Sequence, residues 1–426
     1  MQPSLITYPL HERRLANGLR VLVNPDASVP VVAVNLWYDV GSADETPDRT
    51  GLAHLFEHLM FQGSAHVRSG DHLGLIQAAG GSVNGTTSYD RTNYFEAVPK
   101  PALRMAMWLE ADRLGTLLET VDQASLDNQR DVVKEEKRQR YDNVPYGDVW
   151  HRLLAFSFPA DHPYAHPTIG SMDDLDAATL ADIRAFFRAH YRASRAVLTL
   201  SGDVTAAEGF RLAEQYFGGL PHEPGRPRPE LATLPPHEGI PRREVRAAVP
   251  RDAVYATWRL PAAPDPDLEA LGLATSILGD GITSRLHQAL VRTELAEGAG
   301  AFTMSLARGN SVAVASARCW EGVSPEDLEA AMVDAWQQFV DEGPTAEEHA
   351  RAQAQFAREW LTELAALDQR ADRFGQAATL YGDPDWVNQR LRTVMAVTLD
   401  DIVTATRTWL APENRAVLTY RTSEAS

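Results

Sequence analysis

The chain has 426 residues, more than the ~250 to 300 that one hydrophobic core usually supports, so two domains are expected. The hydrophobic fraction of 44% and the charged fraction of 23% are those of a globular protein and argue against disorder. A net charge of −18 opposes nucleic-acid binding. The single cysteine, Cys319, excludes an internal disulfide and a cysteine-based zinc site.

Membrane and export signals are absent from the sequence pattern. No segment approaches the roughly 18 to 20 apolar residues of a membrane span. The stretch MQPSLITYPLHERR lacks the apolar core of a signal peptide. The sequence therefore predicts a cytoplasmic protein, although a periplasmic protein whose signal peptide had been removed would look the same.

The first half of the chain mixes strand and helix patterns. LANGLRVLVN places an Asn-Gly turn before an apolar run, and VPVVAVNLWYDVG continues as a β-branched strand. SVNGTTSYDRTNYFEAVP alternates polar and apolar residues as a half-buried strand does. Helical patterns follow in PALRMAMWLEADRLGTLL and QASLDNQRDVVKEEKRQRYDN. We expect an α+β fold with an antiparallel-rich mixed sheet and helices packed on one side.

A proline-rich stretch and an internal repeat divide the chain. Residues 219–245 hold seven of the 26 prolines and show no helical or strand period, which is typical of a stiff linker. TLADIRAFFRAHYRASRAVLTLSGD from Thr179 matches TLDDIVTATRTWLAPENRAVLTYRT from Thr398. A repeat of this kind indicates duplication of one α+β domain. The predicted arrangement is a catalytic domain at 1–218, the linker at 219–245 and a homologous non-catalytic domain at 246–426.

The stretch GLAHLFEHLMFQGS, residues 51–64, contains the strongest functional motif. On a helix, His54, Glu57 and His58 lie on one face, because residues three and four apart are neighbours. Two imidazoles one turn apart suit Zn²⁺, and a catalytic zinc site needs three protein ligands and one open position. Zinc lowers the pKa of a bound water towards about 7, and Glu57 is placed to take the proton.

Two observations from the sequence bear on this prediction. Burying two imidazoles and a carboxylate without a partner in so apolar a helix would cost several kcal/mol, which metal binding relieves. The third ligand must come from elsewhere, and NQRDVVKEEKRQRYDN offers Glu135 and Glu136. Spacing alone does not choose between these two glutamates. A solvated charged helix face is the alternative interpretation of that stretch.

The motif H-x-x-E-H is the signature of the inverzincins. HLFEH, followed by GGSVNGTTSYDRTNYF and NQRDVVKEE, resembles the family of pitrilysin, insulin-degrading enzyme and mitochondrial processing peptidase. In that family the third zinc ligand is a glutamate roughly 77 residues beyond the second histidine, which implies Glu135 here. The resemblance covers essentially the whole chain and implies one zinc ion per chain. It also implies duplicated α+β domains and, for short members, a dimer that forms a closed chamber.

The resemblance assigns roles to three further groups. The strand with Asn84, Gly85 and Thr86 corresponds to a sheet edge beside the zinc, to which a substrate peptide adds as an extra strand. Seven residues before the glutamate ligand, active members usually carry a second glutamate, where this chain has Asn128. Asp131, one turn before Glu135, is expected to compensate in part as an outer group around the metal.

A second departure from the family lies in the second half. Active members have an arginine followed six or seven residues later by a tyrosine, and both hold the substrate and the developing oxyanion. Here Arg292 is present, but Gly298 and Ala299 occupy the tyrosine position. Losing an oxyanion donor costs on the order of 10² to 10³ in rate.

Two functional hypotheses follow from this departure. The first is a zinc endopeptidase that cleaves peptides or short unfolded segments and is the catalytic subunit of a heterodimer. Its partner would lack the zinc motif and supply the Arg/Tyr pair. The alternative is a structural or binding subunit that holds zinc without turnover. Glu57 separates them, because a scaffold has no need for the base.

Overall fold

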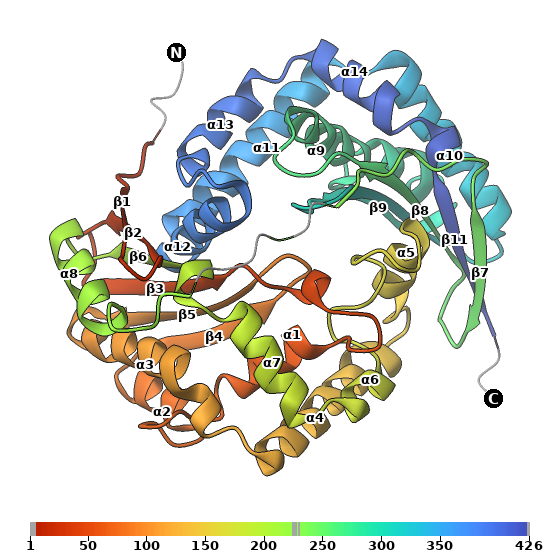
Figure 1. The fold of residues 1–426 in the computed structure, drawn as a ribbon. Helices are drawn as coiled ribbons and strands as arrows, with labels where there is room; N and C mark the ends of the chain where they lie inside the picture. The colour runs from red at the N-terminus through yellow and green to blue at the C-terminus, as the bar shows by residue number, and fades with distance from the viewer. Residues whose placement is uncertain (1–5, 224–227, 229–230, 424–426) are drawn as a thin grey trace. The chain divides into compact units, whose positions relative to one another are not determined.

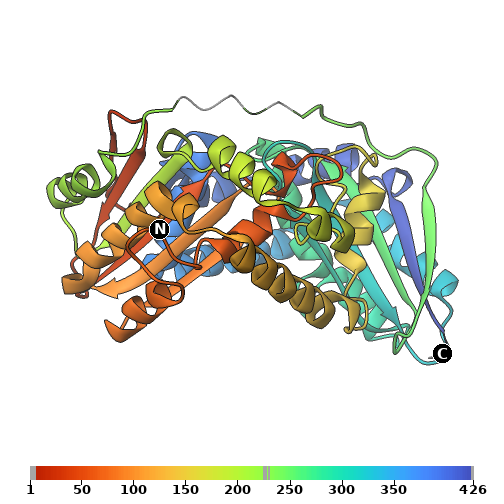
Figure 2. The ribbon, with the colours of Figure 1, turned by 60° about the horizontal axis from the view of Figure 1, so that its bottom comes forward.

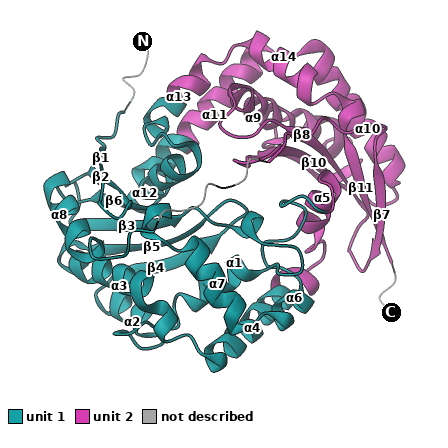
Figure 3. Ribbon diagram, in the orientation of Figure 1, with its two compact units in different colours: residues 1–139, 161–228, 360–390 teal, residues 140–160, 229–359, 391–426 magenta. Residues whose placement is uncertain are grey.

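The computed structural model describes residues 6–223, 228 and 231–423. The chain forms two compact units, shown in different colours in Figure 3. Unit 1 draws on residues 1–139, 161–228 and 360–390, and unit 2 on residues 140–160, 229–359 and 391–426. Each unit therefore contains segments from both sides of the linker, which the contiguous ranges 1–218 and 246–426 do not anticipate.

The sheet of unit 1 has the strand order β1-β2-β6-β3-β5-β4 (Figure 1). Only the pair β2 and β6 is parallel; the other neighbours are antiparallel. Its strands are β1 His11–Arg14, β2 Arg20–Pro25, β3 Val31–Tyr38, β4 Ser82–Thr87, β5 Thr92–Pro99 and β6 Ala196–Gly202. Figure 2 shows the same strands from another direction. The predicted Asn-Gly turn joins β1 to β2, with Gly18 in the left-handed region at φ 93°.

The α-helices of unit 1 precede and follow these strands in the chain. They are α1 Leu52–Leu59, α2 Asp71–Ala78, α3 Leu103–Thr116, α4 Gln123–Lys137, α6 Met172–Ala177, α7 Leu180–His190, α8 Ala206–Phe217 and α12 Leu367–Gln376. Two more helices contribute residues to both units: α11 Ala346–Ala365 and α13 Trp386–Ala396.

Helices cover both faces of the sheet in unit 1. Val23 and Leu200 lie side by side in register on one face, and a Cβ added to Gly209 of α8 would lie 2.8 Å from Val23. On the opposite face, a Cβ added to Gly375 of α12 would lie 2.5 Å from the Trp37 ring. The expectation of helices on one side is thus incomplete, because α12 comes from a distant part of the sequence.

The sheet of unit 2 has the strand order β7-β11-β8-β10-β9, again with one parallel pair, β7 and β11. Its strands are β7 Arg242–Ala247, β8 Ala253–Leu260, β9 Ala296–Met304, β10 Ser311–Cys319 and β11 Ala416–Thr422. Its helices are α5 Val149–Ser157, α9 Pro266–Gly279, α10 Pro325–Glu342 and α14 Leu399–Trp409. The core contains Trp258 stacked on Trp336 at 4.2 Å between ring centroids.

The two sheets share one topology. The order β2-β6-β3-β5-β4 in unit 1 corresponds strand for strand to β7-β11-β8-β10-β9 in unit 2. The repeated sequence forms α7 and β6 in one unit and α14 and β11 in the other. Both helices begin with the same capping box, Thr179 with Asp182 and Thr398 with Asp401, which satisfies orphan N–H groups of the first turn. Duplication of one α+β domain is confirmed.

One boundary of the predicted linker differs in the structure. The strand β7 begins at Arg242, inside the predicted linker 219–245, and part of that linker lies outside the described residues.

Among the described residues, no helix is both long and apolar enough to cross a bilayer. The cytoplasmic location expected from the sequence stays a prediction.

Candidate metal centre

The H-x-x-E-H motif forms the helix α1, as predicted. Its apolar residues Leu55, Phe56 and Leu59 are fully buried. Phe56 stacks on Phe186 of α7 at 5.4 Å between ring centroids. The histidines point away from this core, and their rings are 4.9 Å apart at an interplanar angle of 79°. The apolar face therefore anchors the helix and leaves the polar face available.

Glu45 stabilises the first turn of α1 in place of a side-chain N-cap. The N-cap residue, Gly51, has φ 89°, where glycine is favoured. Glu45 Oε2 accepts a hydrogen bond from the Gly51 N–H at 2.8 Å, and Oε1 accepts one from the Ala53 N–H at 2.7 Å. Burial raises the pKa of Glu45, and the two N–H donors oppose that rise. The sequence motif gave no signal for this role, because Glu45 lies outside the helix.

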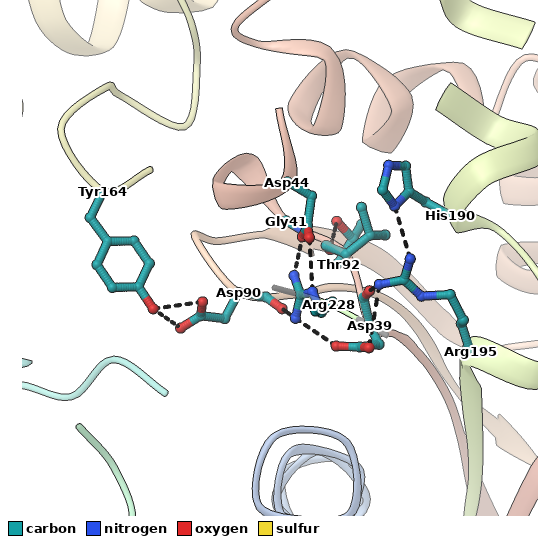
Figure 4. Close-up of polar contacts among 10 residues, drawn as sticks. Asp39, Gly41, Asp44, Asp90, Thr92, Tyr164, His190, Arg195 and Arg228 are labelled. Atoms are coloured by element: carbon teal, nitrogen blue, oxygen red, sulfur yellow. Dashed lines mark hydrogen bonds and ion pairs between the residues drawn. The ribbon is translucent and has the colours of Figure 1, made fainter. Parts of the chain in front are cut away.

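The loop before α1 is also held by an arginine from the predicted linker (Figure 4). Arg228 Nε donates to Asp44 Oδ1 at 2.8 Å, and Nη1 donates to Asp39 Oδ1 at 2.5 Å. Nη1 also donates to the Asp90 carbonyl at 2.9 Å. Because Asp44 is adjacent to Glu45 in the chain, these ion pairs fix the loop that caps the motif helix.

Three donor atoms converge beside α1. Glu136 Oε2 lies 3.2 Å from His58 Nε2 and 3.7 Å from His54 Nε2. The ligand atoms of these three residues all lie within 4.8 Å of one another. Zn–ligand bonds near 2.0 to 2.1 Å in a tetrahedron place ligand atoms about 3.3 Å apart. Two imidazoles and one carboxylate at these separations fit a catalytic zinc site by donor type and spacing.

Glu136 occupies the position predicted for Glu135. The Glu135 side chain is 53% exposed and accepts hydrogen bonds from Arg138 and Gln139, whereas the Glu136 side chain is 16% exposed. Adjacent residues on a helix differ by 100° in direction, so only one can face α1. The assignment of Glu135 is wrong in this structure, because a spacing transferred from a family does not fix helical register.

The same one-residue shift corrects the predicted outer groups. Asn128 and Asp131 are exposed on the face of α4 that carries Glu135. The buried residues of α4 are Leu126, Gln129 and Val133. Gln129 is seven residues before Glu136 and on the same helical face. In the sequence, the apolar residues Leu126 and Val133 mark the buried side of α4, and Glu136 is nearer to that side than Glu135.

The predicted substrate strand lies beside the predicted base. β4 is at the edge of the sheet and pairs with β5, and Asn84 is exposed on it. A Cβ added to Gly85 would lie 3.2 Å from Glu57 Cγ and 3.0 Å from the Tyr94 ring. A side chain at this position would be tight against both residues. Thr86 is half-buried and bonded to its neighbours on β5.

A second cluster of metal-ligating residue types is buried in unit 1. His72 Nε2 lies 3.0 Å from Glu96 Oε1 and 3.9 Å from Glu110 Oε1, and Arg113 Nε donates to Glu110 Oε2 at 3.0 Å. Burial raises the pKa of Glu110 to about 8, raises that of Glu96 and lowers that of His72 to about 3. With His72 neutral and one proton on the carboxyl pair, Arg113 balances the remaining charge. The cluster therefore needs no cation.

This buried carboxyl pair predicts pH-dependent stability. Because the pKa of Glu110 is raised from 4.5 to about 8 on folding, its contribution to stability is present below about pH 4.5 and is lost as the pH rises to about 8. We expect the urea midpoint of unfolding to fall over this range. Glu110→Gln should flatten the fall even if it lowers stability overall, whereas exposed Glu119→Gln should not. Equal slopes for Glu110→Gln and the wild type would contradict this assignment.

Arg292 belongs to unit 2. It follows the short π-helix His287–Val291 and is exposed. Gly298 and Ala299 lie in β9, the edge strand of the second sheet and the topological counterpart of β4. The absence of a tyrosine at these two positions is a property of the sequence and leaves Arg292 without that companion.

Comparison with known proteins assigns both halves to one family. Residues 20–170 match the family described as Insulinase (Peptidase family M16), and residues 177–356 match the Peptidase M16 inactive domain. The protein named Zinc protease PqqE of Helicobacter pylori is 32% identical over 308 residues, covering 70% of this chain and 68% of that protein. An uncharacterized zinc protease of Streptomyces coelicolor is 28% identical, covering 91% of this chain and 84% of that protein.

Solved structures agree with these matches. A protease from Helicobacter pylori has a TM-score of 0.90 and 25% identity, covering 98% of this chain and all of that chain. The periplasmic protease PqqL from Escherichia coli shares the fold with a TM-score of 0.79 at 18% identity, covering 99% of this chain and 48% of that chain. The chain therefore belongs to the insulinase family of metallopeptidases, peptidase family M16.

Proposed function

We propose that the chain is a zinc-dependent endopeptidase with His54, His58 and Glu136 as metal ligands. The observation that carries this proposal is the convergence of three donor atoms beside α1. On the same helix, the glutamate Glu57 directly precedes the ligand His58. The names of the zinc protease relatives support zinc as the metal. We expect one zinc ion per chain.

Each residue has a distinct chemical role in this proposal. Zinc, when bound, lowers the pKa of water and polarises the scissile carbonyl. The Glu57 carboxylate accepts the proton of the attacking water and returns it to the leaving amine. Glu57 directly precedes the ligand His58 in the chain but is not among the three residues whose ligand atoms converge. Zinc would be held by the neutral imidazoles of His54 and His58.

The edge strand β4 supplies the peptide-binding surface in our proposal. Its outer edge has backbone groups that do not pair with β5, and an extended peptide can pair with them as an additional strand. Asn84, Gly85 and Thr86 are the positions involved. Main-chain pairing depends little on side chains, so the substrates are peptides or short unfolded segments of varied sequence, enclosed in a dimeric chamber.

The incomplete Arg/Tyr pair supports a heterodimer. Arg292 is retained, and no tyrosine follows it at the expected distance. A partner that lacks H-x-x-E-H and carries both groups would restore the missing oxyanion donor, worth on the order of 10² to 10³ in rate. We therefore propose that this chain is the catalytic subunit. The second candidate, a zinc-holding subunit without turnover, is disfavoured by the presence of Glu57.

Metal removal tests the proposed function. Purified chain should contain about one zinc and cleave a mixed peptide library, slowly alone and faster with an Arg/Tyr-bearing partner. Dialysis against 1,10-phenanthroline should abolish cleavage, and stoichiometric zinc should restore it. Zinc binding without cleavage under either condition would favour the non-catalytic subunit. Cleavage that survives complete metal removal would refute a metallopeptidase.

A further inference from the structure

Asp372 of α12 lies in the C-terminal half of the sequence, outside both ranges matched to the family, yet belongs to unit 1. Its Oδ1 accepts hydrogen bonds from Asn35 Nδ2 at 3.2 Å, Trp37 Nε1 at 3.0 Å and Asn93 Nδ2 at 2.9 Å. These three donors are each 1% exposed. One carboxylate thus satisfies three buried donors on two neighbouring strands, where an unsatisfied donor is costly.

The bonds of Asn93 extend this network towards β4. With its amide nitrogen directed to Asp372, its Oδ1 accepts from Arg91 Nη1 at 3.0 Å and from Thr86 Oγ1 at 2.6 Å. Asn93 Nδ2 also donates to Asn35 Oδ1 at 3.1 Å, so Asp372 and Asn35 together fix which way the Asn93 amide points. In the flipped orientation, the NH2 group of Asn93 would face the guanidinium N–H groups of Arg91, and no hydrogen bond could form between them.

Arg91 completes the connection to the edge strand. Its Nη1 donates to the Thr86 carbonyl at 2.9 Å, and its guanidinium lies 5.1 Å from the centre of the Trp37 ring. Thr86 is thus held by its hydroxyl and its carbonyl. The preceding residue on β4, Gly85, lies against Glu57. A shift of this strand would move the backbone groups with which a peptide pairs, and peptide binding would weaken.

We propose that Asp372 is a positioning residue for peptide binding, which acts through Asn93 and Arg91 to fix the edge strand β4. This inference rests on the proposed function, since it assumes that a peptide pairs with β4. It gives the C-terminal half of the chain a role in substrate binding that no zinc motif indicates. Asp372 is not one of the three residues whose ligand atoms converge beside α1, so we expect its loss to leave zinc binding unchanged.

Peptide affinity in a non-cleaving background tests this role. In chain carrying Glu57→Gln and loaded with zinc, fluorescence anisotropy with a labelled unstructured peptide should show Asp372→Ala raising the Kd about tenfold. Asp372→Asn keeps one acceptor oxygen but loses the charge, and should fall in between. Asp368→Ala removes a carboxylate one turn earlier on α12 without removing these bonds, and should leave the Kd unchanged. Zinc content should stay equal throughout.

Kinetics of the otherwise wild-type chain separate positioning from general instability. Asp372→Ala should raise KM about tenfold and change kcat less than about threefold at a temperature where the variant is folded. An unchanged Kd in folded Asp372→Ala, or in Asp372→Asn if Ala does not fold, would overturn the inference, as would loss of zinc. Peptide binding that weakens as expected in a chain that never cleaves would support the inference while the proposed peptidase activity fails.

Discussion

Glu57→Gln is expected to abolish peptide cleavage and leave bound zinc in place. Gln has the shape of Glu but cannot accept the proton of the attacking water, and general-base catalysis is worth about 10²- to 10⁴-fold. We expect a loss near the upper end, because the same residue also protonates the leaving amine. The measurement is kcat/KM on a peptide that the wild type cleaves, alone or with an Arg/Tyr-bearing partner, together with the zinc content.

The matched control for this substitution is Glu119→Gln, which makes the same chemical change at an exposed site in the same unit. It should retain wild-type rates. The prediction fails if Glu57→Gln keeps more than about a tenth of the activity with zinc bound, since no other carboxylate in H-x-x-E-H can replace the base. Loss of both zinc and activity would instead make Glu57 a metal ligand.

The second large effect is expected from two adjacent glutamates. Glu136→Gln should weaken zinc binding more than about 100-fold, beyond the 10- to 100-fold that outer groups contribute, because it removes a charged ligand. Glu135→Gln should leave affinity unchanged, since that side chain is 53% exposed and lies on another face of α4. Competition against a chromophoric chelator measures both affinities.

This pair of variants controls itself, because the substitution, the helix and the neighbouring residues are the same. Activity should follow the metal, so Glu136→Gln should be inactive at low zinc and Glu135→Gln should be active. The reverse pattern would mean that α4 is rotated by one residue relative to this structure. Equal loss in both variants would indicate that the helix, rather than one ligand, is affected.

The zinc motif and the duplication could be predicted from the sequence because each is local. His54, Glu57 and His58 share one helical face whatever the rest of the fold does. The repeat from Thr179 and Thr398 preserves a capping box and a strand, and both copies occupy equivalent positions. The edge-strand position of Asn84 was implied by the family resemblance, and the structure places β4 at the sheet edge.

The remaining features depend on tertiary packing. The choice between Glu135 and Glu136 depends on which face of α4 meets α1, which counting residues from His58 cannot settle. Glu45 and Asp372 act on partners that are distant along the chain or outside any motif. No periodicity marks a helix carboxylate that accepts hydrogen bonds from three donors on two strands. Segment 140–160 belongs to unit 2 and segment 360–390 to unit 1, and composition does not predict this exchange between the two halves of the chain.

That exchange has a consequence for dividing the protein. A fragment ending at residue 218 would lack α12 and with it the acceptor for Asn35, Trp37 and Asn93, and it would expose the sheet face that Gly375 covers. A fragment starting at residue 246 would lack α5, which contributes Ser157 to a buried hydrogen bond with Thr257 at 3.0 Å. The proline-rich stretch is therefore a boundary between copies of a duplicated sequence, and a protease that cuts there leaves two pieces that complete each other's folds.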